Sequence, residues 1–361
     1  MFNDVLTELT KVSSSSIEIS NLLSHTNRIW KLIHWPDFVG SQMFFVEIVD
    51  SLSKAIIKYA SQIKDSNVKT QNSQCNVNFS TNQSNSYQKF GSELDYFQRL
   101  VITANNLEKV RDTFRAFYHD LEFDKYQSQA EKQDKIQLFE INKAHLEIMV
   151  NNTCEALVQA LEQSLEIIVA NKILKELDQH MFYLFESPES ASAKESISRL
   201  VEYLDTSFRI YEPIAFKSNF NLFLRIQWIQ LLDQIECDLE KDKSRSPVFF
   251  AKIYDCLDIL VDFFSSGNQG LETDFLQSVE KFRQLKKYLN YSRMDTQKLI
   301  ITYYQEMVDY QNSQRYCDNG KLICRACFHS KDEILAIEIL KCKNLLPMDQ
   351  NGLSDPYHKK K

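Results

Sequence analysis

Glycine and proline are scarce in this chain of 361 residues, with Gly 6 and Pro 6. Sheet-rich folds with many tight turns, doubly wound α/β folds and α/β barrels use more of both residues, because these residues supply the backbone geometry of turns. Long helices need neither. The scarcity excludes those architectures, and apolar residues at 43% of the chain are sufficient for a large core. We therefore predict an all-α fold.

An excess of positive charge is also lacking. The 42 Lys and Arg residues are outnumbered by 49 Asp and Glu residues, which gives a net charge of −7. A nucleic-acid-binding protein needs a basic face, so we expect no nucleic-acid partner.

Motifs of catalysis are missing as well. The chain has no G-x-G-x-x-G sequence and no P-loop, and its 7 His residues form no pair at metal-binding spacing. The carboxylates alternate with lysines on helices, which is typical of solvated faces. We expect no small-molecule substrate and no enzymatic activity. A hydrolase or metal enzyme would require polar residues that converge in the folded helical body.

No segment is apolar for long enough to span a membrane, and residues 1–10 carry Asp4 and Glu8 instead of a basic signal-peptide start. The Cys residues are widely spread, several of them at apolar helix positions, which is typical of reduced thiols. A cytoplasmic protein is therefore expected. The 8 Cys are at positions 75, 154, 237, 256, 317, 324, 327 and 342.

Apolar residues recur at three- and four-residue steps over most of the chain, which predicts amphipathic helices. Asp295 is a suitable N-cap for the last of them, whose apolar residues we expect to face inward: Leu299, Ile300, Tyr303, Tyr304 and Met307. The polar, Asn- and Ser-rich segment 66–92 has no such period and is predicted to be a disordered loop. The helical segments are 29–63, 94–121, 134–181, 194–210, 221–239, 248–264, 271–289 and 295–310.

After Gly320 the apolar pattern changes to strand-like alternation. Residues 321–329 and 334–341 read as two strands joined by a turn, so we place a domain boundary between 312 and 320. Cys324 and Cys327 lie on the first strand. Residues three apart on a strand point to opposite faces, so we interpret them as buried or half-buried cysteines in preference to a zinc site.

The segment LLPMDQNGLSDPY follows the second strand. It carries Asp349 and Asp355 on either side of Asn351-Gly352, which favours a tight turn. Oxygen ligands that converge in a loop suit Ca²⁺, which takes six to eight of them. Spacing alone leaves open an acidic turn without metal.

The run LAIEILKCKNLLPMDQNGLSDPY resembles the second strand and first calcium loop of a C2 domain, the calcium-dependent phospholipid-binding β-sandwich. The helical runs FFVEIVDSLSKAIIKYASQI, ANNLEKVRDTFRAF and DTQKLIITYYQEMVDYQ, together with the helix that carries Trp228, are similar to the C-terminal half of the MUN region. That region belongs to the Munc-thirteen (uncoordinated-thirteen) vesicle-priming family, and the combination resembles above all its Munc-thirteen-four and BAI-associated-protein-three branch.

The resemblance implies an elongated stack of long antiparallel helices, like the rod of a tethering complex, followed by a truncated β-sandwich fragment of two strands. Asp349 and Asp355 match two calcium-ligating aspartates, in a site that is incomplete in this chain because the third calcium loop is missing. We expect either a truncated isoform or an incomplete gene model. The implied segments are 1–65, the end of the first MUN homology region; 93–312, the helical MUN region, with a second homology domain over about 200–312; and 320–361, the start of the C2 domain.

The implied function is vesicle tethering and priming in regulated exocytosis. The resemblance implies that the helices bind the SNARE proteins syntaxin and synaptobrevin, and that the C2 end binds anionic phospholipid with Ca²⁺. The protein would then be cytoplasmic and peripheral to a vesicle, endosomal or plasma membrane. The alternative is a helical scaffold without a membrane role.

Overall fold

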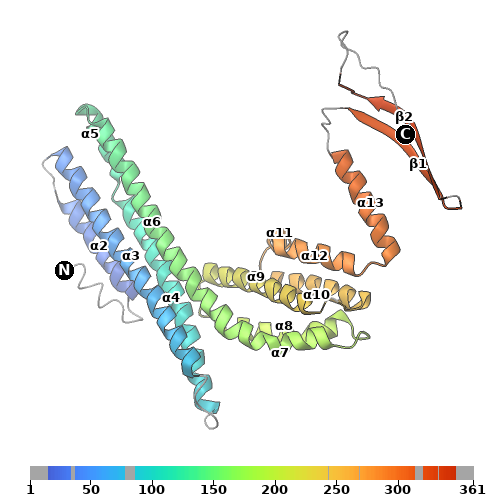
Figure 1. Ribbon diagram of the computed structural model, residues 1–361. Coiled ribbons are helices and arrows are strands. Elements are labelled where there is room, and N and C mark those ends of the chain that lie inside the picture. The colour runs from blue at the N-terminus through green and yellow to red at the C-terminus, as the bar shows by residue number, and fades with distance from the viewer. Residues whose placement is uncertain are drawn as a thin grey trace. The chain divides into compact units, whose positions relative to one another are not determined.

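The structure is a computed structural model that describes residues 15–33, 37–77, 86–242, 244–267, 269–313, 320–331 and 333–346 (Figure 1). The chain divides into two compact units, Met1–Arg293 and Met294–Lys361. The regular elements described in the first unit are all helices, and those of the second are one helix and two strands. The predicted all-α stack followed by a two-stranded fragment is confirmed.

The first unit begins with a bundle in which α6 packs against both α3 and α4, and α2 packs against α4 (Figure 1). The buried stripe of α3 includes Phe45, Val49, Leu52 and Ile56 at helical spacing, as the sequence predicts. Two short helices, η1 and α5, connect α4 to α6. The bounds are α2 Ser15–Leu32, α3 Phe38–Val77, α4 Ser86–Asp120, η1 Phe123–Tyr126, α5 Gln127–Lys132 and α6 Ile136–Ile168.

The prediction that 66–92 is a disordered loop is wrong for most of its length. The α3 helix continues through Val77 and α4 begins at Ser86, while 78–85 lie outside the described residues. The segment contains no proline, and its single glycine, Gly91, does not interrupt α4. Asn, Gln and Ser are mediocre helix formers, but they do not block the backbone hydrogen bonds of a helix that has already started.

The predicted long helix over 134–181 is nearly continuous. It runs through α6, changes to π-helical turns over Val169–Ile173 (η2), and continues as α7 over Leu174–Glu186. A π-helical turn displaces backbone carbonyls from their usual partners. The hydroxyl of Tyr203 donates a 3.3 Å hydrogen bond to the Ile173 carbonyl and a 3.0 Å bond to the Glu176 carboxylate. Burial first, and then Glu176, raise the pKa of Tyr203.

A second bundle follows within the same unit, where α8 packs against α7 and α10, and α12 packs against α9 and α10. The predicted helix over 271–289 is interrupted at Val279, whose ψ of 123° is not helical. The bounds are α8 Ala193–Tyr211, α9 Lys217–Lys241, α10 Pro247–Ser265, α11 Thr273–Ser278 and α12 Glu280–Ser292.

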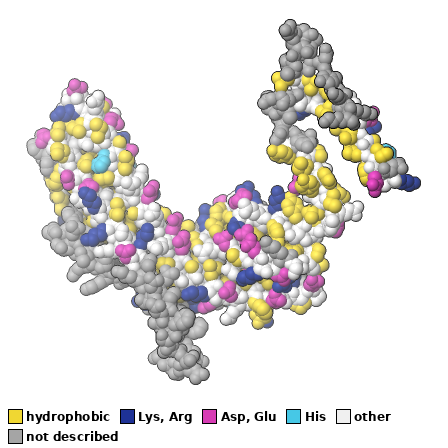
Figure 2. Space-filling view, in the orientation of Figure 1, with side chains coloured by type: hydrophobic (Ala, Val, Ile, Leu, Met, Phe, Trp, Pro, Cys, Tyr) yellow, Lys and Arg dark blue, Asp and Glu magenta, His cyan; other side chains and the backbone are white. Residues whose placement is uncertain are grey.

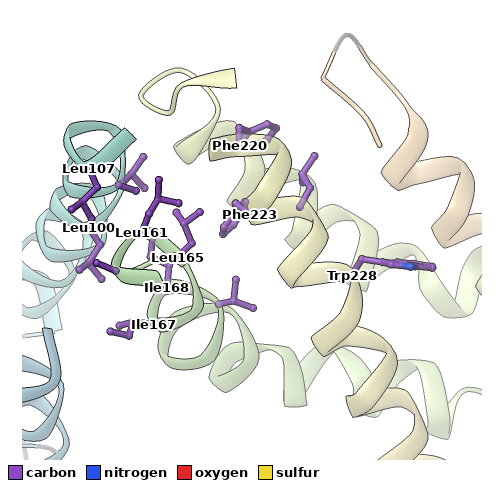
Figure 3. Close-up of a cluster of buried hydrophobic side chains, with 14 of the residues drawn as sticks. Leu100, Leu107, Leu161, Leu165, Ile167, Ile168, Phe220, Phe223 and Trp228 are labelled. Carbon is purple, nitrogen blue, oxygen red and sulfur yellow. The ribbon is translucent and has the colours of Figure 1, made fainter. Parts of the chain in front are cut away.

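Buried side chains from α4, α6 and α9 join the two bundles (Figure 3). Leu161 and Leu165 of α6 lie between Leu107 of α4 and Phe223 of α9 in this cluster. Further along α9, Trp228 is fully buried, and its indole nitrogen donates a 3.2 Å hydrogen bond to the Leu276 carbonyl. A shared apolar core therefore makes the two bundles one compact unit.

The second unit contains α13, Thr296–Ser313, and an antiparallel pair of strands, β1 Lys321–His329 and β2 Ile334–Lys343. Both strands and the turn between them agree with the sequence, and β2 runs two residues further than predicted, with a register shift between Ile323 and Cys324 on β1. The division between the units falls after Arg293, so α13 groups with the strands, whereas the sequence grouped it with the helical region.

The expectation that the apolar residues of α13 face inward is wrong. They are exposed to solvent, from 40% for Leu299 to 64% for Tyr304. The helix itself starts as predicted, because the Asp295 carboxylate accepts a 2.8 Å hydrogen bond from the Lys298 amide. Helical periodicity shows which residues share a face, but it does not show that a neighbouring element covers that face.

Candidate functional site

The two predicted calcium ligands, Asp349 and Asp355, lie outside the described residues. The same holds for the Asn351-Gly352 turn between them. The described chain reaches Leu346, just after β2. The calcium loop therefore stays a prediction of the sequence, placed directly after the second strand of an antiparallel pair.

The strand pair that precedes this loop is exposed on both faces. Leu322 and Phe328 of β1 and Ile337 of β2 are each more than half exposed. One cross-strand pair carries opposite charges, with Arg325 3.7 Å from the Glu338 carboxylate. Figure 2 shows hydrophobic side chains on the surface of the second unit. An isolated hairpin is marginally stable, and such exposure suits strands that belong to a larger sheet.

The cysteine pair on β1 does not form a metal centre with its described neighbours. Cys324 and Cys327 are both exposed, so the interpretation of buried or half-buried strand cysteines is wrong for them. In the part of the chain that the structure describes, no three His, Cys, Asp or Glu side chains come together in a way that could hold a metal ion. They are exposed because no other element among the described residues covers the faces of the two strands.

In the first unit, exposed aromatic residues of α7 border two hollows. Phe182 is 62% exposed and takes part in both. One hollow, of about 430 Å³, lies between α7 and α8 and is lined by Tyr183, Pro188 and Arg199 among others. The other, of about 330 Å³, lies between α7 and α9. This surface can accept an apolar side chain of a partner on either side of Phe182; we call it the α7 surface.

Charged side chains surround the α7 surface in fixed positions. The Arg245 guanidinium pairs with Glu186 at 2.5 Å and with Asp242 at 2.9 Å. The hydrogen bond to Glu186 raises the pKa of Arg245, and hydrogen bonds from Ser244 lower the pKa of Asp242. The Arg199 guanidinium lies 3.6 Å from the centroid of the Tyr183 ring, a cation–π contact.

A buried lysine holds the turn between α7 and α8 beneath this surface. Lys252 of α10 is 6% exposed and donates to the Ser187 carbonyl at 3.0 Å, the Ser187 hydroxyl at 2.7 Å and the Pro188 carbonyl at 3.2 Å. Burial lowers its pKa. One helical turn away, burial raises the pKa of the Cys256 thiol to about 12. The lysine therefore binds the carbonyls of the two residues that follow α7.

A buried amide connects the two bundles of the first unit. The Asn105 side chain on α4 donates to the Ile214 carbonyl at 2.7 Å and accepts from the Phe216 amide at 2.9 Å and from Asn219 at 3.0 Å. Next to it, Glu108 accepts a 2.6 Å hydrogen bond from the Ser218 hydroxyl. Sequence reasoning missed this network, because isolated polar residues on an amphipathic helix carry no pattern that marks them as buried.

The sequence also gave no prediction for the α7 surface, although one local signal was available. Ser192 and Glu195 form a reciprocal capping box at the start of α8, with the Ser192 hydroxyl accepting from the Glu195 amide and the Glu195 carboxylate accepting from the Ser192 amide. A serine followed three residues later by glutamate marks the turn that borders the larger hollow. The exposure of Phe182 could not be read from the sequence.

These features define a helical protein with an exposed aromatic surface on α7, followed by a two-stranded antiparallel sheet. No family model matches the chain. It is 24% identical over 355 residues to BAI1-associated protein 3 of Mus musculus, an alignment that covers 96% of this chain and 28% of that protein. It is 27% identical to protein unc-13 homolog 4B of Drosophila melanogaster, covering 98% of this chain and 29% of that protein.

Protein unc-13 homolog D of Rattus norvegicus is 21% identical over 360 residues, which cover 98% of this chain and 30% of that protein. The resemblance to the unc-13 and BAI1-associated-protein-3 proteins that the sequence predicts is therefore confirmed over nearly the whole chain. The chain spans less than a third of the length of these curated relatives. Among the described residues, no helix combines the length and the apolar character needed to cross a bilayer.

Proposed function

We propose that this chain is the part of a vesicle tethering and priming factor for regulated exocytosis in which a helical body meets a C2 domain. The observation that carries the proposal is the similarity over nearly all of the chain to unc-13 homologues and BAI1-associated protein 3. The helical unit followed by two antiparallel strands supports it, since that order of elements is the one expected where a MUN region precedes a C2 domain.

The proposed mechanism is non-covalent. The helical body binds SNARE proteins, with syntaxin and synaptobrevin as the expected partners. It holds their helices in position, so that less conformational entropy is lost when the SNARE complex assembles. In the full-length protein, the C2 domain binds anionic phospholipid when Ca²⁺ neutralises its loop carboxylates. The protein would act in the cytoplasm, peripheral to a vesicle, endosomal or plasma membrane.

The α7 surface is the proposed docking site for a SNARE helix. An amphipathic helix places apolar residues at three- and four-residue steps, and such residues fit into the hollows on either side of Phe182. Arg199 and the Arg245 cluster then contact polar groups that flank the apolar stripe. The buried Lys252 fixes the turn beneath, so the surface is formed before the partner binds.

A binding measurement tests this proposal. The full chain is titrated with the cytoplasmic regions of syntaxin and synaptobrevin, and Phe182→Asp is compared with Ile148→Asp, a substitution at an exposed apolar residue of α6. We expect Phe182→Asp to weaken binding at least tenfold, because it places a charge in the apolar contact, and Ile148→Asp to leave it unchanged. A wild-type chain that binds neither protein would favour the scaffold without a membrane role.

Calcium-dependent lipid binding needs a separate measurement. Asp349 and Asp355 alone supply too few oxygens for a tight Ca²⁺ site. We expect weak or no Ca²⁺-stimulated liposome binding by this chain, and restored binding by a version extended through the remaining sandwich strands of a relative. Asp349→Asn with Asp355→Asn should abolish the restored binding. Equal Ca²⁺-dependent binding by both lengths would refute the incomplete-site interpretation.

A further inference from the structure

Aliphatic side chains are exposed at one end of the first bundle, around the turn between α2 and α3. Leu32 is 73% exposed, the highest value among the large hydrophobic side chains of the described residues, and Met43 is 65% exposed. Ile29 and Ile33 lie beside Leu32 at the end of α2 and are also exposed. We call Ile29, Leu32, Ile33 and Met43 the α2–α3 tip; Figure 1 shows the end of α2 and the start of α3 at the same end of the bundle as α5.

An aromatic cluster holds the tip in place from below. Trp30 is buried, and its ring meets Phe45 edge-on with centroids 5.1 Å apart and stacks on Phe44 at 6.2 Å. Phe45 in turn contacts Phe123 of η1 at 4.8 Å. The exposed aliphatic residues therefore stand next to residues that are fixed in the core. Their positions are therefore fixed by the packed aromatic residues beside them.

The tip also carries two exposed cations. Arg28 and Lys31 are exposed on the same turn of α2, and neither forms an ion pair in the part of the chain that the structure describes. Among the nearby carboxylates, Glu122 pairs with Lys125, and Lys31 further lowers the pKa of Glu122. Asp124 lies 2.9 Å from Lys143, and Asp37, just before α3, accepts a 2.6 Å hydrogen bond from the Gly40 amide.

The shape of the tip favours a flat partner. A docked helix needs a row of apolar residues along several turns, but the tip gathers its residues at the end of one helix and the start of the next. Aliphatic side chains next to exposed cations are the combination that inserts into the interface of an anionic bilayer. We propose that the α2–α3 tip contacts an anionic lipid surface without calcium. This contact is additional to the calcium-dependent one proposed above.

The experiment uses the full chain and vesicles of phosphatidylcholine with or without phosphatidylserine, sedimented in the presence of EGTA. Leu32→Gln with Met43→Gln removes the aliphatic contact, and Arg28→Gln with Lys31→Gln removes the charge. Ile141→Gln with Ile148→Gln, at exposed apolar residues of α6, is the matched control. Circular dichroism confirms that each variant is folded.

We expect the wild-type chain to bind phosphatidylserine vesicles in EGTA and the aliphatic variant to bind about tenfold more weakly. The charge variant should also lose about tenfold, with a weaker dependence on salt, and the control should match the wild type. Retained binding by both tip variants would overturn the inference. So would binding that appears only with Ca²⁺ and depends on Asp349 and Asp355, although that outcome would leave the proposed function intact.

Discussion

The two compact units differ in whether their apolar side chains are buried. In Met1–Arg293 the helical stripes meet one another, and residues such as Trp228 and Leu165 are buried in a shared core. In Met294–Lys361 the same kind of stripe on α13, and both faces of the strand pair, are exposed. The comparison teaches that a regular apolar pattern specifies secondary structure by itself, but becomes stabilising only when a second element covers it.

Thiol chemistry should show the largest difference between the units. Cys256 in α10 is 1% exposed, and burial raises its pKa to about 12, whereas Cys324 and Cys327 in β1 are exposed. The reactive species is the thiolate. At pH 8 and with iodoacetamide, we expect Cys256 to react on the order of a thousandfold more slowly than the β1 cysteines. Peptide mass spectrometry measures each rate.

The control for this prediction is the unfolded chain. In concentrated urea all three cysteines lose their environments and should be alkylated at similar rates. If Cys256 reacts as fast as Cys324 in the native protein, the helical core around α10 is open to solvent, and the contrast between the units disappears.

Truncating one aromatic residue in each unit gives the next largest difference. Trp228→Ala removes a fully buried ring and its hydrogen bond to the Leu276 carbonyl, and we expect it to lower the free energy of unfolding of the first unit by about 3–5 kcal/mol. Tyr304→Ala removes a ring that is 64% exposed, and we expect a change within about 0.5 kcal/mol. Urea titrations followed by circular dichroism measure both. Similar losses would mean that an element covers α13 in solution.

The helices and strands themselves could be predicted to a large extent from the sequence. The period change near residue 320 correctly gave both strands, and Asp295 correctly gave the start of α13. The long helix through 134–181 was also recognised, but the π-helical turns at Val169–Ile173 were not, and the Ile173 carbonyl there accepts a hydrogen bond from Tyr203 of α8. The local sequence pattern of a helix does not show which residues of other helices will contact it.

The errors have the same physical origin. Segment 66–92 was judged by its polar composition, although it lacks the proline that would end a helix and its one glycine lies inside α4. The stripe of α13 was assumed to be covered because most such stripes are. The candidate surfaces at Phe182 and at the α2–α3 tip could not be predicted at all, since they depend on which apolar residues the fold leaves exposed. The predicted calcium residues lie outside the described residues and stay a prediction.

The smallest expected effect concerns the start of α13. Because this helix is exposed along its described length, its stability depends on its own ends more than on packing. Asp295→Ala removes the acceptor of the 2.8 Å hydrogen bond from the Lys298 amide, and we expect a local loss of about 1 kcal/mol. Hydrogen exchange measured by mass spectrometry should show roughly fivefold faster exchange in the first turn of α13. The unfolding midpoint of the first unit should not change.

Asp295→Asn is the matched control, because its side-chain oxygen can still accept that hydrogen bond and asparagine is as good an N-cap as aspartate. We expect it to exchange like the wild type. If both variants exchange alike, the cap contributes nothing and another contact holds the helix. If Asp295→Ala leaves exchange unchanged and also destabilises the first unit, α13 is packed against a neighbour. Packing against neighbouring elements would then stabilise both units, and they would not differ in this respect.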